Sequence, residues 1–369
     1  MSDYLEAPAE AARPPLGGAS TLARLALIGA ALAAVAGTFA YLGGWFTPNE
    51  LTPARFTDAF EYVAGVHPGF RRNHAKGLGA SGFFDSNGNG VRLSKAVVFR
   101  PGRLPVIGRF SLSGGQPYAA DMPETVRGLA LEFSLPDGEL WRTAMINLPV
   151  VPAGTPAAFY EFIIASAPDP KTGKPDPAKM KSFLTRHPET EEAMKIIKGR
   201  AVSSGFGNST YHGLHAFRFV NAAGDSIPVR WLLTPTQPFE AADTASAPKD
   251  KNYLFDALVT QIQRQPLRWH LIVIIGQPGD PTHDPSIAWP EGREKVDLGM
   301  LTLDRAESDE TSAATDLNFD PLVLPAGIAP SDDPFLSARS AVYSQSFTRR
   351  AGETKQPSMI RPADARKGG

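Results

Sequence analysis

Two short segments of the sequence contain residues that could form one reactive site. The first, Phe70–Gly77, is a basic stretch that contains His74, and a histidine can act as a general acid–base group near neutral pH. The second, Asp333–Tyr343, places Arg339 four residues before Tyr343. On a helix this spacing puts both side chains on one face, where a guanidinium favours the phenolate form of a tyrosine. A phenolate is a ligand that ferric iron accepts.

Other motifs match known patterns but lack the context that those patterns need. Gly77–Gly82 satisfies G-x-G-x-x-G, yet it follows a basic stretch and no buried strand, so we do not expect a dinucleotide site. Asp85–Gly90 begins like a calcium loop, but its twelfth position is Ala96, where a glutamate is needed. His212 and His215 lack a nearby H-E-x-x-H pattern, so structural roles are favoured over zinc binding.

Composition and charge exclude several classes of protein. The 369 residues include 37 Lys and Arg against 38 Asp and Glu, a net charge of -1 that favours no nucleic-acid partner. The absence of cysteine excludes disulfides, thiolate haem ligation, iron–sulfur clusters and cysteine-based peroxidases. The 34 glycines and 34 prolines are typical of strands joined by long loops rather than of a helix bundle.

The N-terminal region predicts a membrane anchor. Residues 1–23 are polar and predict a disordered cytoplasmic tail, and residues 24–46 predict a transmembrane helix. Leu25–Phe46 carries no charge, which matches the ~20 apolar residues that a bilayer needs. A cleaved signal peptide is the alternative, although its apolar region is usually shorter. Arg13 and Arg24 precede the span, so the positive-inside rule predicts a single-pass protein of the inner membrane with its large domain on the periplasmic side.

Residues 53–350 predict one α+β domain with a largely antiparallel sheet, and residues 351–369 predict a flexible tail. Widely spaced apolar runs with few strand–helix alternations favour antiparallel pairing. Asn221–Gly224 predicts a hairpin turn. Strands are predicted at Ala96–Phe99, Val106–Leu112, Gly128–Leu135, His215–Val220, Val229–Leu233 and Trp269–Ile275. Helices are predicted at Pro156–Ser166, Pro177–Ile197 and Pro334–Phe347.

Six separate segments, in order, resemble the catalase-related peroxidases, which are short members of the haem catalase superfamily. The resemblance covers about Arg55 to Arg350 and leaves out the N-terminal anchor and the last residues. The matching segments are RRNHAKGLGASGFF, GRFSLSGG, RGLALEF, YHGLHAFRFVNAAG, DPSIAWPEG and FDPLVLPAGIAPSDDPFLSARSAVYSQSFTRR. The resemblance implies an antiparallel β-barrel of the haem catalase type with surrounding helices.

The same resemblance implies roles for the two segments that carry chemistry. His74 would be the distal acid–base residue, with Ser111 hydrogen-bonded to it. Tyr343 would ligate the iron of haem b as a tyrosinate, and Arg339 would hold it in that form. Peroxide would be the substrate, with an external electron donor whose identity the sequence leaves open.

Further residues match positions that contact the haem in this superfamily. Arg71, Arg109 and Arg350 would bind the haem propionates, and Phe159 and Phe162 would line the distal side. Large catalases continue with further helices, and some bind NADPH. This chain has no length left for that part, so NADPH is not expected, while the oligomeric state stays open.

One position departs from the catalase pattern. Catalases carry an asparagine as a second distal polar residue, and the alignment places Ile146 there with Asn147 next to it. A register shift of one residue would restore the asparagine, so Asn147 stays a candidate catalytic residue. An isoleucine would offer no hydrogen bond to peroxide and would disfavour its dismutation.

These observations predict a haem peroxidase that reduces organic hydroperoxides and hydrogen peroxide, with weak catalase activity at most. One alternative is a hydroperoxide isomerase or lyase, because a related branch of the superfamily rearranges fatty-acid hydroperoxides. Another is a non-catalytic haem-binding module tethered to the membrane. The presence of His74 disfavours such a module, because mere storage of haem needs no distal base.

Overall fold

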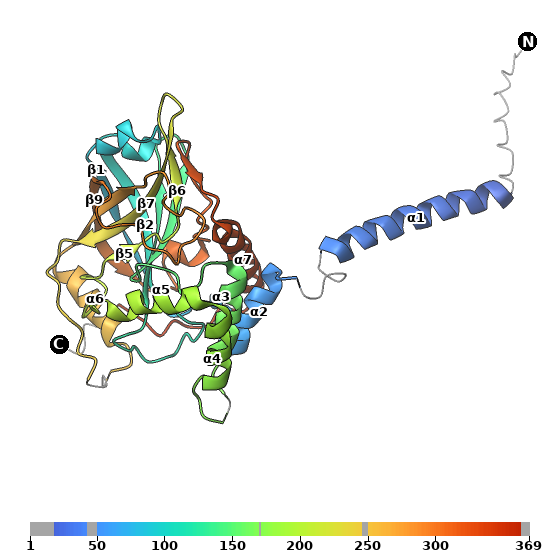
Figure 1. Ribbon diagram of the computed structural model, residues 1–369, viewed down its shortest axis with the longest axis horizontal. Coiled ribbons are helices and arrows are strands. Elements are labelled where there is room, and N and C mark those ends of the chain that lie inside the picture. Colours follow the sequence, from blue (N-terminus) through green and yellow to red (C-terminus); the bar gives the residue numbers. More distant parts are fainter. Residues whose placement is uncertain (1–17, 43–49, 170, 246–249, 363–369) are drawn as a thin grey trace, which may run out of the picture. The chain divides into compact units, whose positions relative to one another are not determined.

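The computed structural model describes residues 18–42, 50–169, 171–245 and 250–362. Contacts divide the chain into two units, Met1–Thr52 and Pro53–Gly369. In the first unit, helix α1 (Gly18–Leu42) contains a span, Ser20–Tyr41, that is long and apolar enough to cross a membrane (Figure 1). A signal sequence near an N-terminus passes the same test.

Helix α1 begins earlier than the sequence analysis expects. Gly18 to Ala23 belong to the helix and not to a disordered tail, because Ala and Leu at this point favour continuation of the helix. The rest of the predicted tail, residues 1–17, and the end of the predicted span, residues 43–46, lie outside the described residues.

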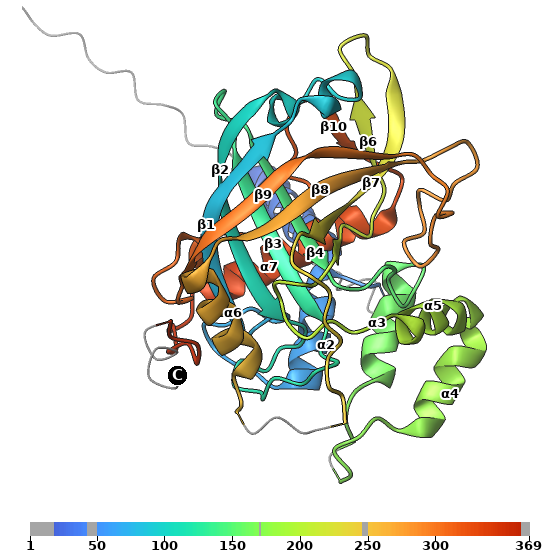
Figure 2. The same cartoon turned by 90° about the vertical axis from the view of Figure 1, so that its left-hand side faces the viewer.

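The second unit is built on a closed antiparallel barrel of eight strands (Figure 2). The strands follow one another around the barrel in the order β7, β5, β4, β3, β2, β1, β9 and β8, and β8 pairs back onto β7. This architecture confirms the predicted fold class. The eight strands are β1 (Gly77–Ser86), β2 (Gly102–Leu112), β3 (Arg127–Ser134), β4 (Leu140–Ile146), β5 (Tyr211–His212), β7 (Ser226–Pro235), β8 (Leu267–Ile275) and β9 (Lys295–Glu307). Two more strands, β6 (Phe217–Val220) and β10 (Ile328–Pro330), extend the sheet beside β7.

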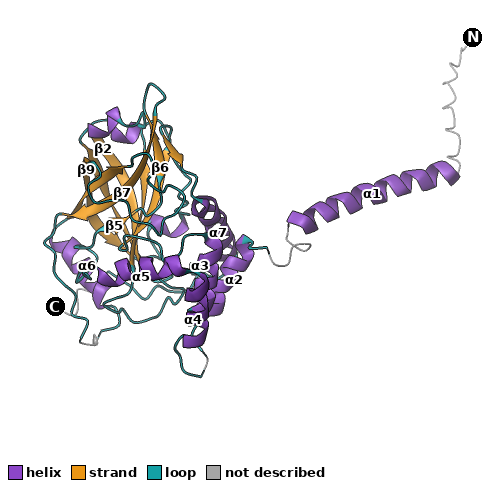
Figure 3. Cartoon of the chain, in the orientation of Figure 1, coloured by secondary structure: helices purple, strands orange, loops and turns teal. Residues whose placement is uncertain are grey.

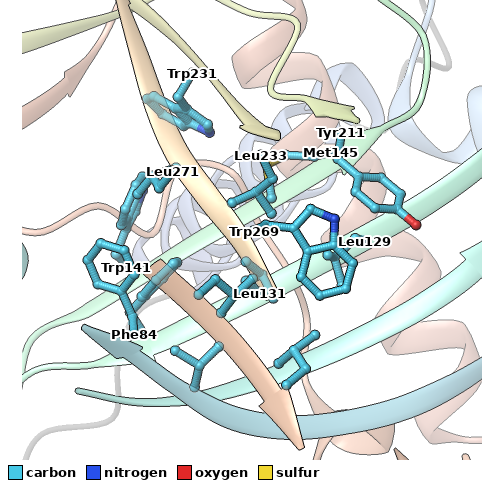
Figure 4. Packing of buried hydrophobic residues seen from close by; sticks show 14 of the residues in the cluster. Phe84, Leu129, Leu131, Trp141, Met145, Tyr211, Trp231, Leu233, Trp269 and Leu271 are labelled. Carbon is cyan, nitrogen blue, oxygen red and sulfur yellow. The ribbon is translucent and has the colours of Figure 1, made fainter. Parts of the chain in front are cut away.

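The interior of the barrel is filled with side chains. Trp141 stacks on Phe133 with ring centroids 4.8 Å apart and meets Trp231 edge-on at 5.2 Å. The indole N–H of Trp231 donates to Thr143 Oγ1 at 3.0 Å, which satisfies the one polar group of that ring. Figure 4 shows Trp141 and Trp231 among the buried side chains of this core, together with Leu131. A barrel of eight strands is just wide enough for side chains to fill, so the functional site lies elsewhere.

Helices cover the outside of the barrel (Figure 3). Three of them, α2, α3 and α7, contact one another. Helix α7 begins where the Asp333 side chain accepts a hydrogen bond from the Phe335 N–H and Pro334 occupies the first turn, and Gly352 follows its last residue. The helices are α2 (Pro53–Ala64), α3 (Pro156–Ala165), α4 (Pro177–Arg186), α5 (Pro188–Gly199), α6 (Tyr253–Arg264) and α7 (Pro334–Ala351). Short 3₁₀ turns occur at Asn89–Arg92, Val97–Phe99 and Ala313–Asp316.

Two predicted elements differ from the structure. The run Ala96–Phe99 is a 3₁₀ turn and not a strand, because so short an apolar run carries no periodicity that separates the two. The predicted helix Pro177–Ile197 is two helices, since Pro188 has no backbone N–H and begins a new helix. The turn Asn221–Gly224 is confirmed, with the Gly224 N–H donating to the Asn221 carbonyl at 3.1 Å. The other predicted strands and helices are present within a few residues.

The segment after α7 packs against the domain, although the sequence analysis assigns residues 351–369 to a flexible tail. The Glu353 carboxylate forms an ion pair with Arg72 and accepts a hydrogen bond from the Gly69 N–H at 2.7 Å. Ile360 is 2% exposed within the main hydrophobic core. Many residues of this segment are polar, and its composition therefore predicted a flexible tail although a few residues anchor it. Residues 363–369 lie outside the described residues.

This packing predicts a measurable contribution to stability. Ile360→Ala is expected to lower the free energy of unfolding by ~2–4 kcal/mol, because it removes a buried side chain and leaves a cavity. Ile287, which is 47% exposed, offers a matched control, and Ile287→Ala is expected to cost less than about 1 kcal/mol. Urea unfolding followed by circular dichroism measures both. Equal effects of the two variants would show that the segment is not anchored.

Candidate active site

A cavity of about 570 Å³ lies against the outer face of the barrel. Its volume falls in the ~300–1,000 Å³ range of small-molecule and cofactor pockets. On β2, Arg109 and Ser111 line the cavity, whereas Phe110 and Leu112 between and after them belong to the core, as the alternation of a strand requires. Helices α2, α3 and α7 supply further lining residues. Nine predicted site residues line the cavity: Arg71, His74, Arg109, Ser111, Phe159, Phe162, Arg339, Tyr343 and Arg350.

His74 lies over a row of small residues that crosses the barrel strands. Gly77, Ser111 and Gly128 are register partners on β1, β2 and β3. A Cβ on Gly128 would lie 3.1 Å from the His74 ring, so only a glycine leaves the ring its place. The ring nitrogen Nδ1 is 2.9 Å from Ser111 Oγ. The sequence gives no sign that Gly128 leaves room for the His74 ring, because it does not show which residues lie side by side across strands.

The backbone holds His74 in an unusual conformation. Its φ is +56°, in the left-handed region that non-glycine residues rarely adopt. The Asn73 side-chain oxygen accepts hydrogen bonds from the N–H groups of His74, at 2.9 Å, and Gly114, at 2.8 Å. The Arg109 guanidinium donates to the His74 carbonyl at 2.9 Å. Such strain persists where surrounding contacts fix it, and it is frequent at functional sites.

The surroundings of His74 keep its imidazole neutral. Burial, followed by repulsion from Arg109, Arg339 and Arg71, lowers the pKa of His74 to about 3. A neutral imidazole has one nitrogen that accepts a proton and one that donates. Nδ1 lies 2.9 Å from Ser111 Oγ, and the tautomer that carries its hydrogen on Nδ1 has Nε2 as the proton acceptor.

On helix α7, Arg339 and Tyr343 contact each other as their spacing predicts. The Arg339 guanidinium donates to the Tyr343 hydroxyl at 2.9 Å. A buried pair acts near this arginine: His215 Nδ1 is 2.7 Å from Oδ2 of Asp333, the residue that precedes α7, and His215 also lines the cavity. Burial lowers the pKa of His215 to about 4, with the Asp333 hydrogen bond opposing. The sequence analysis expects His215 to be structural and gives no role to Asp333.

Three guanidiniums from distant segments gather at the cavity. Arg71 donates to the carbonyls of Ala314, at 2.9 Å, and Leu317, at 3.1 Å, and Arg109 pairs with the Asp309 carboxylate at 2.6 Å. Arg350 donates to a backbone carbonyl, and its buried Nη2 has no hydrogen-bond partner among the described residues.

These guanidiniums repel one another. The pKa values of Arg71 and Arg350 are lowered first by burial and then by the neighbouring arginine charges. Among the described residues, Arg109 alone of the three has a direct carboxylate partner, so the cluster keeps positive charge that an anionic group would neutralise. The cluster therefore suits a ligand with two carboxylates, which is what a haem presents through its propionates.

The cavity distinguishes between Ile146 and Asn147. Ile146 lines it, whereas Asn147 does not. Ile146 is the register partner of Gly128, so its side chain lies on the face of the sheet that carries the His74 ring. The Asn147 side-chain oxygen instead accepts a hydrogen bond from the Arg127 N–H at 2.8 Å. The cavity therefore does not support the candidate role of Asn147 beside His74, because Asn147 follows the end of β4 and its side chain binds the Arg127 backbone.

Among the described residues, no group of three or more His, Asp or Glu side chains could hold a metal ion. A metal ion in the cavity would therefore need most of its ligands from a cofactor and not from the protein. The iron of a haem does so through its ring nitrogens, and a tyrosinate is a known axial ligand. Tyr343 and the three arginines thus fit a haem better than a free metal ion.

The barrel, with a tyrosine–arginine pair on an outer helix, defines a protein with the fold of the haem catalases. Catalase A from Saccharomyces cerevisiae has a similar structure, with a TM-score of 0.70 and 22% sequence identity over 77% of this chain and 61% of that chain. This chain thus spans about three fifths of that protein. A fungal catalase gives a TM-score of 0.69 over 77% of this chain and 59% of the other.

The chain belongs to the catalase family, whose model matches residues 68–360. It is 39% identical to a catalase-related peroxidase of Synechococcus elongatus over 83% of this chain and 90% of that protein. It is 34% identical to a catalase-related peroxidase of Mycolicibacterium paratuberculosis over 82% of this chain and 96% of that protein. These relatives place the chain among oxidoreductases that act on peroxide. Members of the family generally bind haem.

The buried histidines predict a loss of stability in mild acid. Burial lowers the pKa of His212 from 6.5 to about 4, so between these values the unfolded chain binds more protons than the folded one. Stability is then lost as the pH falls from about 6.5 towards 4, by ~1.4 kcal/mol per pH unit. Between pH 7 and pH 5, the wild type is expected to lose ~2 kcal/mol more than His212→Asn in urea unfolding. His283→Asn, which alters an exposed histidine, is the control. Identical losses in the wild type and His212→Asn would contradict the assignment.

Proposed function

We propose that the chain is a haem b-dependent peroxidase that reduces organic hydroperoxides, and hydrogen peroxide, with an external electron donor. The observation that carries this proposal is that one cavity is lined by a neutral, positioned His74 and by Tyr343 with its arginine partner. A storage site for haem would need no acid–base residue. The overall reaction consumes two electrons and two protons and converts a hydroperoxide to an alcohol and water.

The residues of the cavity have separate parts in holding haem. Tyr343 would provide its phenolate oxygen to the iron, and Arg339 stabilises that negative charge through its hydrogen bond. Arg71, Arg109 and Arg350 would pair with the propionates, and the aromatic rings of Phe159 and Phe162 would pack on the macrocycle. Bound haem supplies the redox chemistry that cleaves the oxygen–oxygen bond.

His74 moves the proton on which that cleavage depends. Its Nε2 takes the proton from the peroxide oxygen nearer the cofactor and delivers it to the farther oxygen, which leaves as alcohol or water. Ser111 keeps the ring oriented through Nδ1, the low pKa of His74 keeps the ring neutral, and in the tautomer that donates to Ser111 the Nε2 atom accepts a proton. The protein therefore presents an acceptor for the proton over the whole neutral and mildly acidic range.

The apolar side chain of Ile146 beside His74 favours peroxidation over dismutation. Dismutation requires a second molecule of hydrogen peroxide to be held and oxidised, and a second polar group would help to hold it. Ile146 offers no hydrogen bond at this place, whereas it contacts the alkyl part of an organic hydroperoxide favourably. We therefore include weak oxygen evolution in the proposal.

For location, we propose that α1 anchors the enzyme in the inner membrane with the domain on the periplasmic side. Support comes from the length and apolar character of Ser20–Tyr41 and from Arg13 and Arg24, which precede the uncharged run.

Tyr343→Phe tests the proposed ligand. Removal of the phenolate oxygen is expected to weaken haem retention strongly or to change the absorption spectrum to that of another ligand. The measurement is the haem content and spectrum of the purified full-length protein, followed by stopped-flow mixing with ethyl hydroperoxide and a dye donor. Tyr160→Phe, which alters a tyrosine outside the cavity lining, is the control. An unchanged spectrum in Tyr343→Phe would refute the ligand. Conversion of hydroperoxide without oxidation of the dye would point to an isomerase or lyase instead.

Ile146→Asn tests the proposed balance of activities. A hydrogen bond in such a site is worth ~1–3 kcal/mol, or roughly one to two decades in rate, so the variant should release more oxygen from hydrogen peroxide relative to dye oxidation. An oxygen electrode and a dye assay on the same preparation give the ratio. The change Ile146→Val, which keeps the side chain apolar and β-branched, should leave the ratio nearly unchanged. Oxygen release by the unmodified protein at the rate of a true catalase would contradict the proposed role of Ile146.

A further inference from the structure

We propose that the cavity binds hydroperoxides with a long unbranched alkyl or acyl chain, and that Met194 and Ile197 of helix α5 form the wall that recognises this chain. The proposal rests on the proposed peroxidase function and names its substrate class. It derives from the part of the cavity that extends away from the arginines and from Tyr343.

A continuous apolar wall leads from His74 to α5. Ile146 lies on the strand face that carries the His74 ring, as the register partner of Gly128. Ile146 and Met194 both pack against one hydrophobic cluster, which contains Leu148 and Ile197. All four of these apolar residues line the cavity. The wall thus begins where the peroxide group would react and ends on a helix that carries none of the proposed haem-binding residues.

Polar groups are scarce along this part of the cavity. Among the described lining residues between 144 and 197, Ser166 alone has a polar side chain. Helix α2 contributes two further apolar residues, Phe60 and Val63, to the same cavity. A polar or charged substrate would lose its hydrogen bonds to water here without replacement, whereas each buried methylene of an alkyl chain would gain affinity. Met194 is only partly buried, and its unbranched side chain adapts to chains of different shape.

The substrate could reach the cavity from either of two sources. A hydroperoxide on a membrane lipid is one source, because the proposed anchor α1 belongs to the same chain. A free hydroperoxide in solution is the other source, and it has the same alkyl chemistry. The experiment separates the two.

The test uses the full-length haem-loaded protein in detergent micelles and straight-chain primary alcohols as unreactive probes. Calorimetry is expected to show affinity that rises by about fourfold per methylene until the wall is covered and then levels off. The catalytic efficiency, kcat/KM, for the matching alkyl hydroperoxides should rise in parallel. Affinity that does not depend on chain length, after correction for uptake of each alcohol by the micelles, would overturn the proposal.

Variants on one helix provide the matched comparison. Met194→Gln is expected to weaken dodecanol binding by about tenfold, because it places an amide along the alkyl chain. Ile196→Gln is the control, since Ile196 is 40% exposed and does not line the cavity. Ile196→Gln should leave the turnover of ethyl hydroperoxide unchanged, and Met194→Gln should lower kcat/KM for a long-chain hydroperoxide much more than for ethyl hydroperoxide. Equal dodecanol binding by wild type and Met194→Gln would overturn the assigned wall.

The design separates this proposal from the proposed function. If ethyl hydroperoxide is not reduced, the peroxidase function fails whatever alcohols bind. If it is reduced and chain length has no effect, the chain-binding wall alone fails. In vesicles containing oxidised phosphatidylcholine, reduction of the intact lipid identifies the membrane as a source. Reduction only after a phospholipase releases the fatty-acid hydroperoxide identifies the free form, and each result supports the substrate class.

Discussion

The close approach of the His74 ring to the outer face of the barrel is the constraint on which the site depends. The ring fits because Gly128 has no side chain and because the Ser111 hydroxyl meets Nδ1 at 2.9 Å. The positive φ of His74 is fixed by Asn73 and Arg109, which bind its backbone on both sides of the residue. The contacts of Asn73, Ser111 and Arg109 therefore define a single position for the imidazole. Precise placement of an acid–base group costs conformational freedom once, during folding, and not in each catalytic cycle.

The gathered arginines show how the site balances stability against ligand binding. Arg71 and Arg350 are held by backbone carbonyls from the segment around Ala314 and not by carboxylates. Their lowered pKa values reflect burial and mutual repulsion, a cost that an anionic ligand relieves. The same charges help to keep His74 neutral. A bound group with two carboxylates would therefore stabilise the domain by mass action and would soften the repulsion that His74 experiences.

The surroundings of His74 are polar toward the arginines and apolar toward α5. Ser111 and Arg109 lie on β2, while Ile146 and Leu148 lead away from the ring into an apolar cluster. With this asymmetry, the peroxide end of a proposed substrate would meet His74, which moves protons. The alkyl end would meet an apolar surface that offers no hydrogen bonds. An apolar wall also keeps water away from the reacting atoms, where electrostatic interactions then act more strongly.

Residue types and local spacing were enough to predict the class of fold and the contact between Arg339 and Tyr343. The i,i+4 spacing of Arg339 and Tyr343 is local, so helix geometry alone places the two together. The wide spacing of apolar runs indicated antiparallel strands, but the glycine-rich β1 was missed because its residues have low strand propensity. Helix α6 was missed as well, although its buried residues recur with helical spacing.

The choice between Ile146 and Asn147 required the folded chain. Ile146 is the last residue of β4 and pairs with Gly128 beside His74, whereas the Asn147 side chain binds the Arg127 backbone and does not line the cavity. The meeting of Arg71, Arg109 and Arg350 is likewise a property of the folded chain, because they come from a loop, a strand and a helix far apart in sequence. Contacts within one helical turn follow from local geometry, whereas contacts across strands depend on a register that the whole barrel sets.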